Sequence, residues 1–247
     1  MEDIESWELK FELCQYSDKL LNLLTILNKR DNKIIDLNEV KKSIYYAKKY
    51  HGNQLRKSGE AYYTHPLEVA YLFAEYVGKE KREYYTTNLI VIAILHDCLE
   101  DTALTYQMIK TIFSKNVADG VQDLTRVKDG IKYEAYKTLD SLYLQRKIDL
   151  LYIKLFDRFH NIVTLNQMVC MKQVKIAEET YDHFIIYAEC LELEKLSKEL
   201  INISYKYLPI KTDPSQLLEQ SHFSFELDDY HVLALTSQND EDQKHNQ

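Results

Sequence analysis

The segment AILHDCLEDT, residues 93–102, brings a histidine and three carboxylates to the end of an apolar run. On a helix, His96 and Glu100 are four residues apart, as are Asp97 and Asp101, so the members of each pair are neighbours on one face. Three carboxylates this close repel one another, and some take up protons, unless a cation offsets their charge. A helix C-terminus also disfavours acidic side chains. The residue types and their spacing therefore favour a divalent metal site over a solvated helix end.

A second polar group lies within the largely apolar segment 140–167. Lys154, Asp157 and Asn161 are three and four residues apart along the chain and so share a helical face. An aspartate between apolar stripes is costly unless it is paired or bound to a metal. Asp157 is therefore a candidate metal ligand, with an ion pair to Lys154 as the alternative that these residues leave open.

A histidine also ends an apolar helical stripe earlier in the chain. His51 by itself is typical of a core histidine, but the residues that follow it carry Arg56, Lys57, Ser58 and Gly59. Such a loop offers positive charges and backbone N–H groups that suit phosphates. If it lay beside a carboxylate-bound metal, the two together would form a site for a phosphorylated substrate.

Helices must position these side chains. The 247 residues include only five glycines and three prolines, and such a shortage of turn-formers favours an all-α fold. Apolar periodicity predicts no strands and a less regular stretch over 129–140. The predicted helices span about residues 4–28, 38–51, 66–77, 84–99, 105–114, 116–126, 140–167, 172–190 and 191–207.

Composition excludes several classes of protein. The formal net charge of −8 argues against nucleic-acid binding, which favours a basic surface, although a local basic cluster or a metal could still hold a small anion. Four cysteines, at 14, 98, 170 and 190, lack zinc-site spacing. The acidic N-terminus is no signal peptide, and no apolar run is long enough to span a membrane. We expect a cytoplasmic protein with reduced thiols.

The order of these residues resembles the HD superfamily of metal-dependent phosphohydrolases, and longer motifs resemble the RelA/SpoT-type hydrolases. The first motif, HxxQxRKSGExYxxHP, spans residues 51–66. The second, HDxxEDT, spans 96–102, and the third, IKLxDRxHNxxTL, spans 153–165. The sequence IAEET at 176–180 resembles the family's following helix, and the similarity extends over about residues 38–205.

The resemblance implies an all-α HD-domain helical bundle that degrades the alarmones of the stringent response. Such an enzyme, a phosphoric diester hydrolase, uses Mn²⁺ to remove the 3′-diphosphate of ppGpp or pppGpp, which yields GDP or GTP and pyrophosphate. Glu100 and Asp101 are then expected to position and activate water. The implied metal ligands are His51, His96, Asp97 and Asp157. The implied substrate-binding residues are Arg56, Lys57 and Ser58 for the guanine and its nearby groups, and Lys154 and Asn161 for the ribose and phosphates.

Some positions depart from the family pattern. Ala61 stands where the opening motif usually has proline, Thr64 stands where asparagine is common, and residues 188–192 lack the family's arginine and glycine. Two alternatives remain open, because the contacts to the base depend on loop geometry and because the chain has extra N- and C-terminal segments. One is the same chemistry on another nucleotide, such as removal of the 2′-phosphate of NADPH, and the other is a non-catalytic alarmone-binding regulatory module.

The predicted organisation is that of a stand-alone small alarmone hydrolase. We expect an N-terminal helical extension over 1–35, the HD-type phosphohydrolase domain over 36–208, and a C-terminal tail over 209–247 with a disordered end. About 40 residues after the domain leave no room for a synthetase domain. Nothing in the sequence indicates an oligomeric state.

Overall fold

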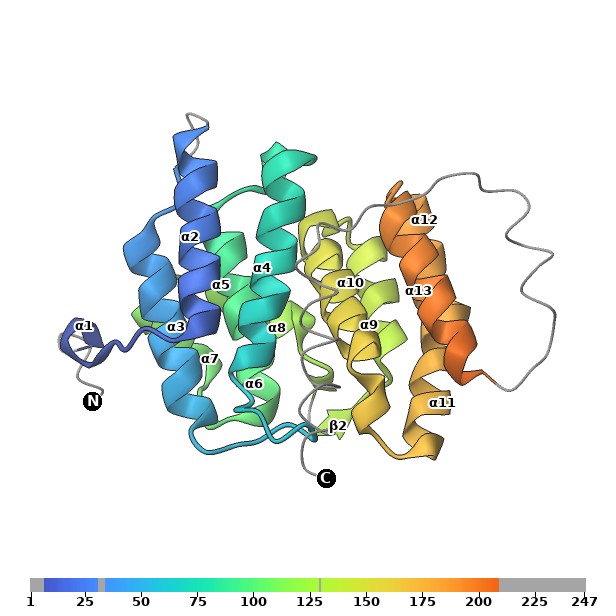
Figure 1. Ribbon diagram of the computed structural model, residues 1–247. Coiled ribbons are helices and arrows are strands. Elements are labelled where there is room, and N and C mark those ends of the chain that lie inside the picture. The colour runs from blue at the N-terminus through green and yellow to red at the C-terminus, as the bar shows by residue number, and fades with distance from the viewer. Residues whose placement is uncertain (1–6, 31–33, 129, 209–247) are drawn as a thin grey trace, which may run out of the picture. The chain divides into compact units, whose positions relative to one another are not determined.

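The computed structural model describes residues 7–30, 34–128 and 130–208 (Figure 1). These residues form an all-α bundle with one short hairpin, so the predicted fold class is confirmed. The tail 209–247, for which a disordered end was predicted, lies outside the described residues. The elements are α1 (Trp7–Lys10), α2 (Gln15–Lys29), α3 (Leu37–His51), α4 (Thr64–Lys79), η2 (Arg82–Tyr84), α5 (Thr87–Leu95), α6 (Cys98–Asp101), α7 (Tyr106–Ile112), α8 (Lys115–Leu124), β1 (Val127–Lys128), β2 (Ile131–Lys132), α9 (Ala135–Leu144), α10 (Ile148–Val163), η3 (Leu165–Gln167), α11 (Cys170–Glu179), η4 (Thr180–Phe184), α12 (Ile185–Cys190) and α13 (Glu194–Tyr207).

Helix α5 runs through the middle of the core. It begins where Thr86 accepts a hydrogen bond from the Leu89 N–H group, as an N-cap residue does. Its residues 89–95 are apolar on every side and all buried, as expected for a helix surrounded by protein. Helices α3, α4, α8 and α10 pack against it. The C-terminal end of α5 is therefore a rigid point inside the molecule.

The predicted helix over 84–99 is broken where that rigid point is reached. Helix α5 stops at Leu95, and the short helix α6 starts at Cys98. Between them, His96 Nδ1 donates to the carbonyl of Ala93 at 2.8 Å, which satisfies one of the acceptors that a helix end leaves without an intrahelical partner. The break places the side chains of His96 and Asp97 at the C-terminal end of the core helix.

A second break corrects the prediction of one helix over 140–167. The chain forms α9 and α10 instead, because Arg146 has a φ of +57°, which a right-handed helix does not accommodate. The Lys147 N–H group donates to the Leu142 carbonyl at 2.9 Å and that of Arg146 to the Tyr143 carbonyl at 3.0 Å. This pair of bonds is the Schellman motif that closes helices. Helix α10 therefore starts afresh at Ile148.

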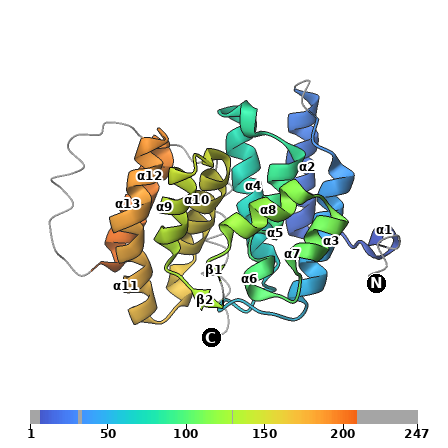
Figure 2. The same cartoon turned by 180° about the vertical axis from the view of Figure 1, so that it is seen from behind.

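The stretch 129–140, predicted to be irregular, contains the start of α9 and part of a hairpin. Strands β1 and β2 pair antiparallel, Val127 with Lys132 and Lys128 with Ile131. The prediction of no strands is therefore wrong at this point. Gly130, with a φ of +76°, lies in the turn. Figure 2 shows the hairpin at the same end of the bundle as α6.

Helix α2 belongs to the same core as the later helices. Leu20 and Leu24 are fully buried in it, and α2 packs along α4. Tyr16 donates to the Glu60 carboxylate at 2.7 Å, across 44 residues of sequence. The predicted extension over 1–35 is thus in contact with the loop that carries the first motif.

The loop between α3 and α4, residues 52–63, folds back on itself. Leu55 and Ala61 form an isolated bridge, and the Arg56 N–H group donates to the Glu60 carbonyl at 2.8 Å. Gly59 makes the turn with a φ of +87°, a conformation that glycine adopts without steric cost. The loop therefore has a defined shape without secondary structure of its own.

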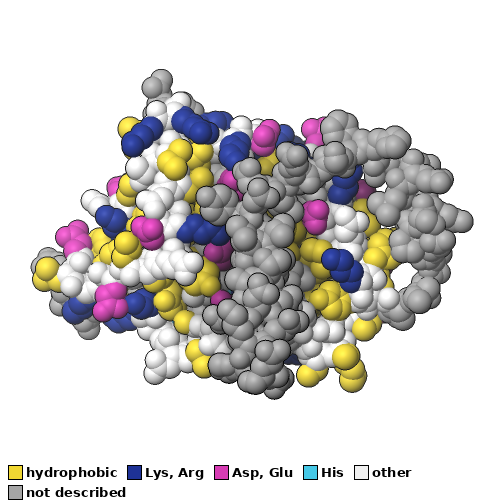
Figure 3. All heavy atoms as spheres, in the orientation of Figure 1, with side chains coloured by type: hydrophobic (Ala, Val, Ile, Leu, Met, Phe, Trp, Pro, Cys, Tyr) yellow, Lys and Arg dark blue, Asp and Glu magenta, His cyan; other side chains and the backbone are white. Residues whose placement is uncertain are grey.

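Surface features agree with the composition. Across the described part of the face in Figure 3, basic and acidic side chains are interspersed. In the described part of the chain, no helix is both long and apolar enough to cross a membrane.

Candidate metal and active site

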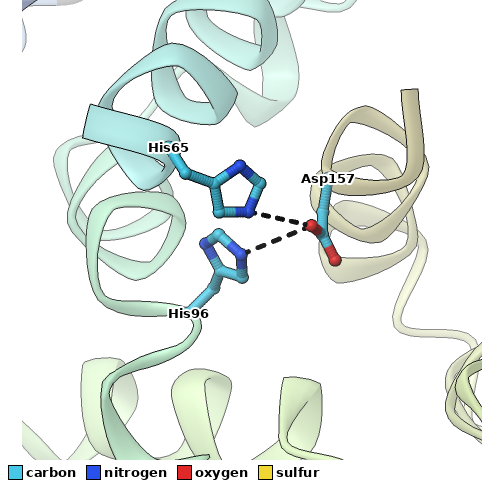
Figure 4. A group of neighbouring side chains, drawn as sticks. All are labelled: His65, His96 and Asp157. Carbon is cyan, nitrogen blue, oxygen red and sulfur yellow. Dashed lines mark ion pairs between the residues drawn. The ribbon is translucent and has the colours of Figure 1, made fainter. Parts of the chain in front are cut away.

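Two histidines and an aspartate from three helices meet in the core. His65 comes from the first turn of α4, His96 from the end of α5 and Asp157 from α10. One ligand atom of each lies within 4.8 Å of the others, and all three residues are buried. Figure 4 shows the side chains pointing toward one another, with Asp157 Oδ1 3.2 Å from His65 Nε2 and 3.7 Å from His96 Nε2.

Asp97 lies directly beside this group. Its Oδ1 is 3.2 Å from His96 Nε2 and its Oδ2 is 3.5 Å from His65 Nε2. Two imidazole nitrogens and two carboxylates therefore surround one small region. This mixture of nitrogen and oxygen donors suits a divalent transition metal.

His51, predicted as a metal ligand, is not part of the group. Its Nδ1 is 2.9 Å from Gln54 Oε1, its Nε2 is 3.8 Å from the Cys98 sulfur, and its ring stacks on Tyr62. Gln54 in turn donates to the Asp101 carbonyl at 2.8 Å. The group contains His65 where the prediction had His51, because His51 ends α3 and supports the loop, whereas His65 faces α5 and α10.

A signal for His65 was present in the sequence. His65, Val69 and Phe73 are four residues apart on α4, and all are buried. In the sequence, His65 lies on an apolar helical stripe just as His51 does. The first motif contains both histidines, and spacing within the motif does not say which one reaches the helices that carry the other ligands.

The donor set demands a cation. Because His96 Nδ1 donates to Ala93, neutral His96 has a lone pair on Nε2, which faces the oxygens of Asp97 and Asp157. This buried nitrogen has no hydrogen-bond partner among the described residues. Burial alone would lower the pKa of His96, but the Asp97 and Asp157 carboxylates raise it to about 10. A proton or a metal ion must offset the charge, and the residues fit a metal ion.

Two residues predicted to bind substrate are in contact with Asp157. Lys154 Nζ is 3.0 Å from Asp157 Oδ2 and is itself buried. Asn161 donates from Nδ2 to Asp157 Oδ1 at 2.7 Å. Burial opposes ionisation of Asp157, but Lys154 and the two histidines hold the pKa of the carboxyl well below its usual range. Lys154 and Asn161 thus fix the orientation and the charge of Asp157.

The acids of the second motif occupy different environments. Asp101 Oδ2 accepts from the Tyr62 hydroxyl at 3.0 Å, and that hydroxyl is also 3.3 Å from Asp97 Oδ2. Burial, reinforced by the Asp97 charge, raises the pKa of Asp101. Asp101 therefore binds a proton more readily than an ordinary aspartate does.

Glu100 is held in ion pairs. It accepts from Arg126 Nη2 at 2.7 Å and from the Arg126 backbone N–H group at 3.1 Å, and it pairs with Lys132 at 2.6 Å. Burial opposes its ionisation, but Lys132 and Arg126 keep the pKa of Glu100 below its usual value. Glu100 therefore ties the hairpin to α6.

The loop 52–63 contacts the C-terminal end of α10. Arg56 Nη1 is 3.3 Å from His160 Nδ1, and Arg56 Nη2 donates to Thr164 Oγ1 at 3.1 Å. Ser58 donates to Glu60 Oε2 at 3.1 Å, and Lys57 is exposed. Burial, followed by the charges of His65 and Arg56, holds the pKa of His160 well below its usual value.

A pocket of about 210 Å³ lies beside the hairpin. Thr125, Arg126, Tyr133, Lys137 and Thr138 line it. Arg126 connects this pocket to Glu100. Sequence reasoning missed this basic corner because its side chains lie in a segment without periodicity or a distinct motif. It also missed Tyr62, His65 and His160 as functional residues, although they stand inside the quoted motifs.

Residues 43–190 match the model of the HD domain family. A GTP pyrophosphokinase of Myxococcus xanthus is 34% identical over 185 residues, which cover 70% of this chain and 23% of that protein. The GTP pyrophosphokinase rsh of Brucella suis is 34% identical over 181 residues, 70% of this chain and 23% of that protein.

A third relative is named as a hydrolase. The guanosine-3′,5′-bis(diphosphate) 3′-pyrophosphohydrolase of Aquifex aeolicus is 36% identical over 173 residues, 69% of this chain and 24% of that protein. A solved structure of a metazoan SpoT ortholog, described as hydrolysing ppGpp, has a TM-score of 0.48 and 19% identity, and the match covers 74% of this chain and 94% of that one.

The family match covers more than half of the chain, so the chain belongs to the HD-domain family. The curated relatives bear out the resemblance to RelA/SpoT-type hydrolases. The matching region spans about a quarter of the length of these relatives, 23% and 24% in the examples above.

Proposed function

We propose that this chain is a metal-dependent (p)ppGpp 3′-pyrophosphohydrolase that uses Mn²⁺ and releases GDP or GTP and pyrophosphate. The observation that carries the proposal is the buried group of His65, His96 and Asp157, with Asp97 directly beside it, whose ligand atoms converge and need a cation. The name of the Aquifex aeolicus relative supports the choice of substrate.

These four residues would hold the metal ion. Imidazole and carboxylate ligands together suit Mn²⁺. When bound, the ion supplies Lewis-acid polarisation of the scissile phosphoryl group. Lys154 and Asn161 keep Asp157 ionised and oriented for ligation, through contacts of 3.0 and 2.7 Å.

The reaction transfers the 3′-diphosphate group from the ribose to water. The water oxygen forms a bond to the phosphorus next to the ribose 3′ oxygen, the bond from that phosphorus to the 3′ oxygen breaks, and the 3′ oxygen takes a proton. Asp101 is the proposed acceptor of the water proton, because its raised pKa brings it closer to the working pH of a general base. The Tyr62 hydroxyl orients it.

In this proposal, basic side chains at the hairpin and the pocket beside it bind the phosphates of the substrate. Arg126 and Lys132 both pair with Glu100, so one carboxylate offsets two cations. Lys137 adds a further charge at the pocket that Arg126 lines. Local charge of this kind is sufficient to hold a polyanion. Glu100 in this proposal positions the basic hairpin and leaves proton transfer to Asp101.

The loop 52–63 is the proposed guanine-binding element. We propose Lys57 and Ser58 as substrate contacts. Arg56 is a third proposed contact, and it lies against the C-terminal end of α10. The ordered turn at Gly59 gives these residues a fixed starting geometry.

The test is turnover of purified full-length protein with Mn²⁺ and ppGpp, pppGpp or NADPH, with separation of the products by anion exchange. We expect equimolar pyrophosphate and GDP from ppGpp, and none in the presence of a chelator. Asp101→Asn should remove most of the activity. Asp119→Asn is the matched control, because Asp119 is a partly exposed carboxylate whose partners are Lys115 and Tyr106.

Other products would change the conclusion. Orthophosphate from NADPH without turnover of ppGpp would reject the substrate and keep the metal site. Binding of ppGpp without turnover under any metal would reject the enzyme activity. Full activity of Asp101→Asn would transfer the role of base to another residue.

A further inference from the structure

His65 touches a further histidine, the partly buried His160, on the side away from Asp157. His65 Nδ1 and His160 Nδ1 lie 2.8 Å apart, which is a hydrogen bond with one proton between two ring nitrogens. The position of that proton decides whether neutral His65 presents a lone pair or an N–H group to Asp97 and Asp157. Only the lone pair allows His65 to bind a metal.

Arg56 decides the direction of this hydrogen bond. A guanidinium group donates and never accepts, and Arg56 Nη1 is 3.3 Å from His160 Nδ1. His160 Nδ1 must therefore be an acceptor. It follows that His65 Nδ1 carries the proton and that the lone pair of neutral His65 is on Nε2, which is 3.2 Å from Asp157 Oδ1.

We propose that His160 is a positioning residue that fixes the tautomer and the ring orientation of the metal ligand His65, with Arg56 fixing His160 in turn. The same arrangement occurs at His96, where the Ala93 carbonyl accepts from Nδ1. Both histidines thus present Nε2 to the centre. Acceptors of this kind commonly orient metal-binding histidines. The inference rests on the metal site of the proposed function.

Two further features of the structure hold Arg56, His160 and His65 in this arrangement. His160 is three residues after Asp157 on α10, so one helix provides a ligand and orients another. Arg56 is anchored by its bond to Thr164 Oγ1 at 3.1 Å, and Thr164 in turn donates to the His160 carbonyl at 3.0 Å. The loop of the first motif is thereby connected to the metal ligands through His160.

The test compares two substitutions in the full-length protein. His160→Leu removes the acceptor, and His160→Asn keeps an acceptor oxygen at the position of Nδ1. Mn²⁺ affinity is measured from the electron paramagnetic resonance signal of the free ion. We expect His160→Leu to bind Mn²⁺ about 10- to 100-fold more weakly, the usual effect of losing such a partner, and His160→Asn to recover most of the affinity. His183→Leu is the matched control, since His183 stacks on Tyr136 in a different part of the fold.

A second measurement reads the tautomer directly. Long-range nitrogen–proton correlation spectra of the wild-type protein loaded with diamagnetic Zn²⁺ should show His65 protonated on Nδ1, and His160→Leu should lose this single form. Circular dichroism establishes that each variant is folded. Protonation of wild-type His65 on Nε2, or unchanged Mn²⁺ affinity in folded His160→Leu, overturns the proposal. Absence of Mn²⁺ binding in the wild type would instead reject the metal site of the proposed function.

Discussion

Two adjacent residues of α10 carry buried charges into different surroundings. Arg158 pairs with Glu179 at 2.8 Å and lies 3.9 Å from the centre of the Phe184 ring. The other oxygen of Glu179 accepts from the Ala135 N–H group at 3.0 Å, at the start of α9. Each charge in this cluster has an opposite charge or a donor. Asp157 faces the other cluster, in which carboxylates meet imidazole lone pairs.

The difference separates a structural cluster from one built for a ligand. A buried ion pair that satisfies itself holds helices α9, α10 and α11 together and needs nothing more. The Asp157 cluster leaves His96 Nε2 without a hydrogen-bond partner among the described residues. Such a deficit is costly in the core. We infer that the deficit is retained because a cation completes it.

The largest expected effect is loss of catalysis when the Asp157 cluster is changed. Asp157→Asn removes a ligand charge, so pyrophosphate release from ppGpp should fall to background. Asp149→Asn, at the opposite end of the same helix, should retain activity. Turnover by folded Asp157→Asn at the wild-type rate would break the comparison.

The second effect is on stability. Arg158→Ala leaves Glu179 without its charged partner in a mostly buried place, and breaking such a pair costs about 3 kcal/mol in free energy of unfolding. Urea denaturation measures this loss, while KM of the folded fraction should stay near the wild-type value. Lys175→Ala is the control, because its pair with Glu134 is exposed and should contribute little. A KM that rises strongly in Arg158→Ala would show that the two clusters are coupled.

The third effect links metal and stability. A ligand that binds only the folded state at 100 times its Kd adds about 2.7 kcal/mol, so Mn²⁺ should raise the melting temperature of the wild type and a chelator should reverse it. Arg158→Ala should keep this increment, and Asp157→Asn should lose it. An equal rise in melting temperature in both variants would show that Mn²⁺ binds at a site other than the Asp157 cluster.

The smallest effect concerns pH. The Tyr62 hydroxyl bonds to the Asp101 carboxylate and so favours its ionised form. Tyr62→Phe should therefore raise the pKa of Asp101 further, by an amount that corresponds to a hydrogen bond of about 1 kcal/mol. A base is active when ionised, so activity is lost as the pH falls through its pKa, and the acidic limb of kcat/KM should move to higher pH. Tyr63→Phe, its neighbour in the loop, should leave the profile unchanged.

The sequence by itself determined the all-α class and the core helix 89–95, and it predicted that residues 96, 97 and 157 belong to one site. These properties follow from composition, from continuous apolar stretches and from charged residues that an apolar face cannot hold without a partner. The break at Arg146 could not be predicted, because arginine carries no general preference for a positive φ.

Tertiary structure alone decided the partners within the site. His65 takes the place predicted for His51, because the loop 52–63 directs the start of α4 toward α5 and α10. Glu100 and Asp101 are adjacent, yet one pairs with Arg126, 26 residues later, and the other with Tyr62, 39 residues earlier. Periodicity tells which face of a helix is buried. Which side chain arrives opposite that face depends on loops and long-range contacts, and these settle the chemistry of each residue.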